Sequence, residues 1–223
     1  MNIVLQIPVP TSDTTTTTSI SLLELTVKGG WVMIPIGILS IMAIYIIVER
    51  MLTLKKADKD PDRFIEKIKN LIYNGDMAGA INQCQQFDTP FSRMIEKGIT
   101  KIGTPISNIE ASVENVGKME VYKLERNLSI LATISGAGPM LGFFGTVTGM
   151  VQAFIAIAQE EGSVSPKLLS SGMYEAMITT VGGLIVGIIA YVGYNYLVSR
   201  VDSIVHKMEY STIEFLELLQ QPK

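Results

Sequence analysis

Charged residues are scarce in this chain. They make up 17% of its 223 residues, against about 25% in an average soluble domain. Apolar residues reach 48% and the mean hydropathy is +0.34. The net charge of −3 provides no basic surface for nucleic acid. This composition is typical of a protein that resides in a membrane.

Cysteine and histidine occur once each, as Cys84 and His206. A lone cysteine excludes an internal disulfide, and we interpret Cys84 as a small core residue rather than a reactive thiol. A lone histidine leaves no second imidazole for a metal site or for a histidine-based catalytic pair. The sequence therefore predicts a protein that is not an enzyme, with no catalytic residues, no metal site and no cofactor.

Three long runs with few charges predict three membrane-spanning helices. The first covers 31–52 and begins with Trp31, an interfacial anchor. The second covers 128–158 and has no charge, and the third covers 168–198 and contains one, Glu175. No strand pattern competes with these helices. We expect an all-α membrane protein.

Positively charged residues predict the orientation of the spans. They gather after the first span, before the second and after the third, whereas the opposite ends carry two lysines. By the positive-inside rule, segment 1–30 and the loop 159–167 face the periplasm, and segments 53–127 and 199–223 are cytoplasmic. Within the N-terminal segment, the threonine tract 14–18 offers almost nothing to bury, so we predict partial disorder there.

The cytoplasmic segments read as helices. Apolar periodicity and breakers predict helices over 60–75, 76–87 and 90–102. Ser107 with Glu110 has the spacing of a capping box, and the helix that it opens contains no breaker before the second span. We therefore predict that this helix enters the second span unbroken, and that the third span continues into the C-terminal helix. The second and third spans thus extend into a cytoplasmic helical bundle.

Glycine and other small residues recur at helical spacing in the second and third spans. Pairs of small residues four apart let membrane helices approach closely. Any single pair is explained by packing within one chain, whereas the density of glycine favours an assembly of several subunits. The predicted helix-packing residues are Gly138, Pro139, Gly142, Gly145, Gly149, Gly183, Gly187 and Asn195.

Polar residues within the spans are candidates for a proton pathway. Thr146 and Thr180 lie on the small-residue faces, where hydroxyls either line a narrow pore or bond back to their own helix; spacing alone leaves both interpretations open. Glu175, the single carboxylate of the second and third spans, either takes part in proton or subunit coupling or simply reaches the interface. Because no span contains an aspartate, a proton pathway needs its main protonatable group from another polypeptide.

Two motifs carry a family resemblance. The stretch 138–150 (GPMLGFFGTVTGM) closely resembles the Ala-Pro-x-Leu-Gly-Leu-Leu-Gly-Thr-Val-x-Gly signature of the ExbB and TolQ branches of the MotA/TolQ/ExbB proton channel family. The stretch 174–184 (YEAMITTVGGL) is similar to that family's Glu-Ala-Leu-x-x-Thr-Ala-x-Gly-Leu, and Tyr194 with Asn195 matches its Tyr-Asn. This chain departs from the family pattern at two positions: it has Gly138 and Val181 where alanine is usual.

The resemblance implies a homopentameric ring in the bacterial inner membrane. In that family the ring surrounds the helices of an ExbD- or TolR-like partner, which contributes a proton-carrying aspartate. A TonB- or TolA-like protein then passes the motion to the outer membrane. The resemblance makes Thr146 and Thr180 pore-facing hydroxyls, with Glu175 and Asn195 as supporting polar residues.

Several roles are compatible with these features. We favour an ExbB-like subunit that converts proton motive force into work for TonB-dependent transport. The alternatives are a TolQ-like subunit of the Tol-Pal envelope system, or an oligomeric membrane scaffold that conducts nothing. A MotA-like stator fits less well, because that branch usually has four spans.

Overall fold

The computed structural model describes residues 29–59, 62–159 and 166–220. In these three ranges the secondary structure is helical, and the only β pairing is an isolated bridge between Ile102 and Thr104. The predicted all-α fold is confirmed. The helices are α2 (Met33–Ala57), α3 (Asp62–Tyr73), α4 (Met77–Phe87), α5 (Pro90–Ile99), α6 (Ile106–Glu125), α7 (Leu128–Gln159) and α8 (Pro166–Gln220).

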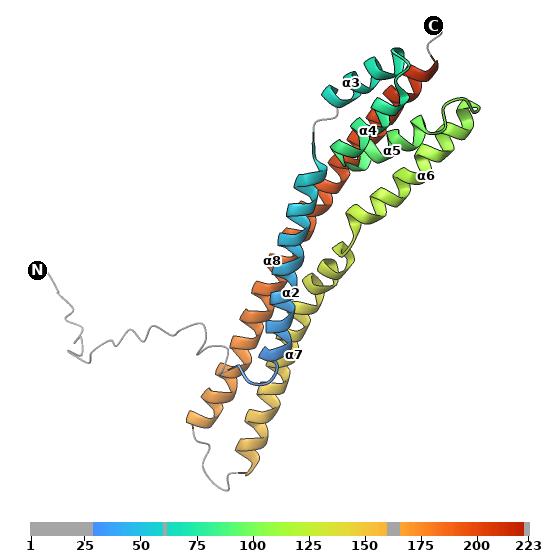
Figure 1. The fold of residues 1–223 in the computed structure, drawn as a ribbon. Coiled ribbons are helices and arrows are strands. Elements are labelled where there is room, and N and C mark those ends of the chain that lie inside the picture. The colour runs from blue at the N-terminus through green and yellow to red at the C-terminus, as the bar shows by residue number, and fades with distance from the viewer. Residues whose placement is uncertain (1–28, 60–61, 160–165, 221–223) are drawn as a thin grey trace, which may run out of the picture.

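Three helical stretches are long and apolar enough to cross a membrane. They are Met33–Ala57, Ile106–Gln159 and Gly172–Gln220, in agreement with the three predicted spans. Figure 1 shows α2, α7 and α8 running side by side, with α7 and α8 continuing past the start of α2. An all-α membrane protein with three spanning helices follows from length and apolar composition together.

Helix α8 joins the membrane part to the cytoplasmic part of the predicted layout. It is one continuous helix of 55 residues, which at 1.5 Å per residue is about 83 Å long, far more than the ~30 Å of a hydrocarbon core. Along its length it packs against α7 and α2, and then against α6 and α5. The predicted continuation of the third span into the C-terminal helix is confirmed.

The predicted unbroken helix through the second span is wrong. The helix ends at Glu125 and restarts at Leu128, and between them Asn127 adopts a positive φ of 66°, a conformation that asparagine tolerates better than most residues. The buried Arg50 of α2 donates to the Lys123 carbonyl oxygen at 3.1 Å. This contact satisfies a carbonyl that the end of α6 leaves without a helical partner, so the break is held in place from another helix.

Helix caps also differ from the prediction. Helix α6 has Pro105 as its N-cap and no side-chain cap bond, so the capping box predicted at Ser107 and Glu110 is wrong. A capping box does exist at the start of α5, where Thr89 and Ser92 bond reciprocally and are both buried. The sequence rule missed it because the rule looks for Glu or Gln at the third helical position.

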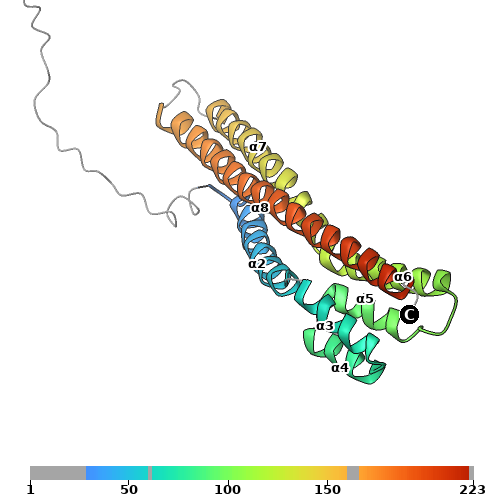
Figure 2. The same ribbon diagram turned by 90° about the horizontal axis from the view of Figure 1, so that it is seen from above.

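The short helices α3, α4 and α5 form a small bundle at one end of α8 (Figure 2). Its centre is a cluster of three aromatic rings, with centroids 4.7 Å apart for Phe64 and Phe87 and 5.2 Å apart for Phe64 and Phe91. Phe215 of α8 packs against Gly98 of α5, where an added Cβ would collide with the ring. Aromatic packing therefore fixes this bundle to the long helix.

Cys84 lies in α4 with 1% of its surface exposed. Burial, with a smaller contribution from Glu96, raises the pKa of the thiol to about 12. Because the thiolate is the reactive form, we expect iodoacetamide to leave Cys84 unmodified in the folded protein at mildly alkaline pH. Labelling is measured by mass spectrometry, with the denatured protein as the fully labelled control. Equal labelling rates in the two states would contradict the burial.

Glu120 of α6 is buried outside the predicted spans, with 4% of its side chain exposed. Arg93 Nη2 of α5 bonds to Oε2 at 2.8 Å, and Lys123 Nζ bonds to Oε1 at 2.7 Å. Burial raises the pKa of the Glu120 carboxyl, but the bonds from the two cations outweigh it. The pKa therefore lies below its ordinary value of 4.5. The ion pair between Arg93 and Glu120 ties α5 to α6.

The lowered pKa of Glu120 in the folded state determines how its contribution to stability changes with pH. The Glu120 contribution is fully present above pH 4.5, the ordinary pKa, and is lost as the pH falls through the folded-state pKa. We expect Glu120→Gln to lower the free energy of unfolding by about 1–3 kcal/mol at neutral pH, and this difference to shrink in acid. Thermal unfolding of both proteins across pH measures it. The matched control is Glu114→Gln, whose side chain is 62% exposed beside Lys118, and which should change little.

Candidate functional site

Glycines bring α7 and α8 into backbone contact. A Cβ added to Gly183 of α8 would lie 2.5 Å from the Gly138 carbonyl oxygen and 2.8 Å from the Gly142 Cα of α7. One added to Gly187 would lie 2.6 Å from the ring of Pro139. Backbone atoms and a proline ring cannot move aside as a flexible side chain does, so a larger residue at either position would separate the two helices.

The same contact continues toward the loop that joins the two helices. Gly145 lies directly against the side chain of Thr179, and a Cβ on Gly149 would be 3.1 Å from the Cβ of Ala176. The glycines predicted for helix packing thus all lie between α7 and α8 of a single chain. Packing within one chain accounts for their density, which therefore no longer favours an assembly of several subunits.

Thr146 of α7 and Thr180 of α8 meet at this interface. Their Oγ1 atoms are in direct hydrogen-bond contact. Each hydroxyl also reaches the Gly142 carbonyl at 3.2 Å and the Ala176 carbonyl at 3.3 Å, one on its own helix and one on the other. We call these two hydroxyls the hydroxyl pair, and the pair with its two carbonyls the four-oxygen cluster.

The four-oxygen cluster contains more acceptors than donors. Each hydroxyl has one proton and two lone pairs, and a carbonyl only accepts. One hydroxyl can therefore donate to the other, which donates to a carbonyl, and the direction can be reversed by rotating both protons. Lone pairs remain to accept a hydrogen bond from a water or a carboxylic acid. The spacing left two alternatives open: hydroxyls that bond back to their own helix, and hydroxyls that face a pore. In this geometry the same hydroxyls can do both.

The start of α2 and the residues just before it cover the opposite side of the α7–α8 pair, where Met33 of α2 lies against Gly182 of α8. Trp31 packs edge-on against Phe144 of α7, with ring centroids 6.1 Å apart, and Gly29 lies beside Ile178 of α8. Phe144 and Ile178 each precede a threonine of the hydroxyl pair by two positions, which is about 200° around a helix. The hydroxyl pair therefore points away from α2.

The side that carries the hydroxyl pair is apolar and open. Thr146 and Thr180 are themselves half-buried. Large apolar residues one turn away on either side of them are exposed: Phe143 and Met150 on α7, and Met177 and Leu184 on α8. In a membrane-spanning chain such a surface contacts lipid or another protein, so a partner that covers it would meet the hydroxyl pair.

Glu175 lies apart from the hydroxyl pair. Its carboxylate is against Gly30, where an added Cβ would collide with Oε1 and where φ is +66°. Gly30 precedes α2, whose first turn has no acidic residue and no side-chain cap. A carboxylate near a helix N-terminus is favourable, so Glu175 is placed where it can stabilise the start of α2.

Asn195 also lies outside the cluster. Its Nδ2 donates to the Tyr191 carbonyl of the same helix at 2.8 Å, and its side chain is exposed. Of the predicted polar residues, the structure thus brings only Thr146 and Thr180 together. In the three described ranges, His, Cys, Asp and Glu form no group of three or more that could hold a metal ion.

Sequence reasoning missed the backbone half of the cluster. The acceptors belong to Gly142 and Ala176, which stand four residues before Thr146 and Thr180, so the i−4 rule for hydroxyls in helices points to them. It also gave no role to Thr179, which is buried and donates to the Ala176 carbonyl at 2.8 Å. Small residues at those positions leave the carbonyls accessible to both helices.

Comparison with known proteins places these features in a family. The sequence matches the MotA/TolQ/ExbB proton channel family over residues 86–210. That range is more than half of the chain and includes the whole hydroxyl pair and its glycine interface. The chain belongs to the MotA/TolQ/ExbB proton channel family. This proton channel family is not a known enzyme family. The family match and the three apolar helices together support a multi-pass inner-membrane protein.

Relatives within the MotA/TolQ/ExbB family come from both branches. A putative biopolymer transport protein ExbB homolog of Methanothermobacter thermautotrophicus is 30% identical over 191 residues, 85% of this chain and 67% of the relative. The Tol-Pal system protein TolQ of Haemophilus influenzae is 36% identical over 85 residues, 38% of this chain and 37% of the relative. Biopolymer transport protein ExbB of Salmonella typhimurium is 35% identical over 95 residues, 43% and 37% respectively. The percentage identity to the TolQ relative is therefore close to the percentage identity to the ExbB relatives.

Proposed function

We propose that this chain is the ring-forming subunit of an inner-membrane motor that converts proton motive force into mechanical work. The observation that carries the proposal is the hydroxyl pair of Thr146 and Thr180, half-buried within two spanning helices and directed away from α2. Hydroxyls that line a membrane pathway can exchange hydrogen bonds with water or with a protonatable group. Copies arranged with α2 outward would present their hydroxyl pairs to a shared centre.

A second polypeptide supplies the proton-carrying acid. Glu175 is the only carboxylate in the predicted second and third spans and lies against Gly30 just before α2, so the four-oxygen cluster has no acid of its own. We propose a homopentamer around an ExbD- or TolR-like single-span partner, whose membrane carboxylic acid exchanges hydrogen bonds with the hydroxyl pair. A TonB- or TolA-like protein receives the motion.

The orientation is part of the same proposal. Cations cluster at the end of the spans where α2 finishes and α6 approaches, and the positive-inside rule makes that end cytoplasmic. The N-terminus and the loop between α7 and α8 are then periplasmic. The bundle of α3 to α6 and the C-terminal half of α8 are cytoplasmic.

The role in the envelope has two candidates. We favour the ExbB-like one, in which the motor supports TonB-dependent outer-membrane transport. Because the TolQ protein of Haemophilus influenzae is as similar over its matched segment as the ExbB proteins are over theirs, a TolQ-like role in the Tol-Pal system is the second candidate. The two differ in which partner the ring retains.

Native mass spectrometry of the protein, extracted gently after coexpression with an ExbD-like or a TolR-like protein, tests the proposal. We expect a complex of several identical copies, five in the pentamer, that holds the smaller single-span protein. Retention of one partner and not the other assigns the branch. A stable monomer, or a ring that retains neither partner, would contradict the motor and favour a scaffold that conducts nothing.

A further inference from the structure

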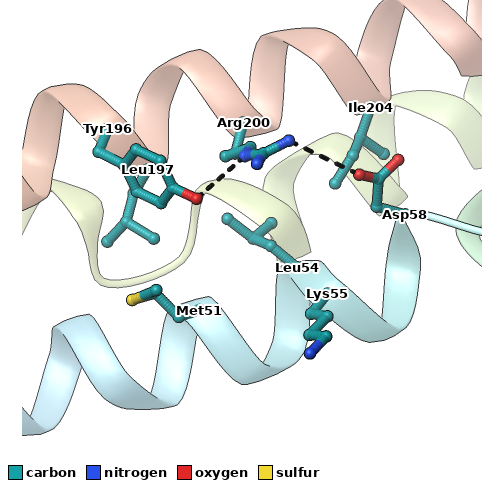
Figure 3. Close-up of a pocket in the computed structure, with 8 residues that line it drawn as sticks. All are labelled: Met51, Leu54, Lys55, Asp58, Tyr196, Leu197, Arg200 and Ile204. Atoms are coloured by element: carbon teal, nitrogen blue, oxygen red, sulfur yellow. Dashed lines mark hydrogen bonds and ion pairs between the residues drawn. The ribbon is translucent and has the colours of Figure 1, made fainter.

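A hollow of about 350 Å³ lies between the end of α2 and the middle of α8. Figure 3 shows Arg200 lying across it, between the ring of Tyr196 and Asp58. The hollow lies at the positively charged end of the spans, where the last turn of α2 contains Lys55 and Lys56. The lining residues are Met51, Leu54, Leu197 and Ile204, which are apolar, and Lys55, Asp58, Tyr196 and Arg200, which are polar.

The described residues that line the hollow carry more positive than negative charge. Arg200 Nε donates to the Tyr196 hydroxyl at 3.2 Å, and the guanidinium lies over the Tyr196 ring, 5.5 Å from its centroid. Asp58 is 4.0 Å from Arg200 and also pairs with Lys207. Arg200 and Lys207 thus share the Asp58 carboxylate, and Lys55 is a further cation among the described residues that line the hollow. The Arg200 side chain is 53% exposed, so its guanidinium is accessible to a ligand.

Two exposed stripes lead along the spans to this hollow. They repeat at three- or four-residue spacing, so the members of each stripe share one helix face, and each stripe ends in a cation of the hollow. From the first residue to the cation, the α8 stripe rises about 18 Å, close to the ~15 Å depth of one hydrocarbon leaflet. The stripes are Ile44, Val48, Met51 and Lys55 on α2, and Ile188, Val192, Tyr196 and Arg200 on α8.

We propose that this hollow binds the phosphate headgroup of an anionic phospholipid, with an acyl chain lying along the exposed stripes. A guanidinium offers paired N–H groups that match two phosphate oxygens, and the Tyr196 hydroxyl, which accepts from Arg200, still has its own proton to donate. The excess of cations selects an anionic headgroup over a zwitterionic one. The apolar stripes select a lipid over a free phosphate ion.

The test uses the full-length protein in nanodiscs or mild detergent, with phosphatidylglycerol or phosphatidylcholine as the probe. We expect wild type to retain phosphatidylglycerol in native mass spectra in preference to phosphatidylcholine. Loss of a charged hydrogen-bond partner should weaken retention about tenfold in Arg200→Gln, and to a smaller extent in Lys55→Gln, an exposed side chain whose replacement leaves the fold intact. Lys101→Gln, an exposed cation far from the hollow, is the matched control.

Several outcomes would overturn the lipid site. Equal retention of the two lipids, or unchanged retention in both Arg200→Gln and Lys55→Gln, would remove the charge argument. Displacement of phosphatidylglycerol by inorganic phosphate at similar concentration would indicate a site for the free ion. Wild type that retained no lipid, and whose Lys55 was still protected from acylation in the delipidated ring, would also overturn the site. The hollow would then be a contact between copies of the chain.

Discussion

Replacing Thr146 or Thr180 by valine is expected to lower the rate of energised transport at least tenfold while leaving the amount of assembled complex unchanged. Valine keeps the shape of threonine but removes the hydroxyl, so the four-oxygen cluster loses the oxygen that we propose meets the partner's acid. A hydrogen bond to a charged group contributes about 1.5–3 kcal/mol, which corresponds to at least a tenfold lower rate. Growth that depends on TonB-dependent uptake, in cells lacking their own copy of the gene, measures the loss.

Matched substitutions separate the hydroxyl from the fold. Thr133→Val makes the same change on the same helix, where the hydroxyl bonds only back to Ser129 at 2.9 Å and the side chain is exposed; it should retain full activity. Thr146→Ser and Thr180→Ser keep the hydroxyl and should retain most of it. Full activity in both valine variants would show that the hydroxyl pair is not on the proton pathway.

Gly183→Ala is expected to lower the stability of the protein and its transport activity together. The new Cβ would lie 2.5 Å from the Gly138 carbonyl oxygen and 2.8 Å from the Gly142 Cα, so α7 and α8 must move apart. Overpacking of this kind costs about 1–3 kcal/mol, and it also separates the hydroxyl pair. We expect a lower unfolding temperature in detergent and a loss of transport together.

The control for Gly183→Ala is Gly136→Ala. Gly136 lies on α7, but an added Cβ there meets nothing within 4 Å, and alanine favours helix over glycine. This variant should be as stable as wild type or more stable. If Gly183→Ala left both unfolding temperature and transport unchanged, the close contact of α7 with α8 would be wrong.

The spans were predictable because their signal is local. A run of 18 or more apolar residues has few alternatives to a membrane helix, and the continuation of α8 followed from the absence of a breaker. The break before α7 was not predictable in the same way, since it depends on Arg50, which lies 73 residues before the Lys123 carbonyl that it binds. A contact between distant segments leaves no periodic trace in the sequence.

The candidate site was predicted in part. Spacing placed Thr146 and Thr180 on small-residue faces, and the structure brings them into contact. Spacing could not say that the glycines of those faces pack α7 against α8 of the same chain, because close helix contacts look alike within and between subunits. Nor could it place Glu175 against Gly30, since that depends on where α2 starts relative to α8.

The most direct test of the proton pathway is proton flux into proteoliposomes that contain the purified ring with its single-span partner. Under an imposed proton gradient we expect flux through the complex, none through the ring alone, and none through a complex whose ring carries Thr146→Val and Thr180→Val together. Flux through the ring alone would contradict the requirement for a partner's acid. Undiminished flux through the double variant would contradict the role of the hydroxyl pair.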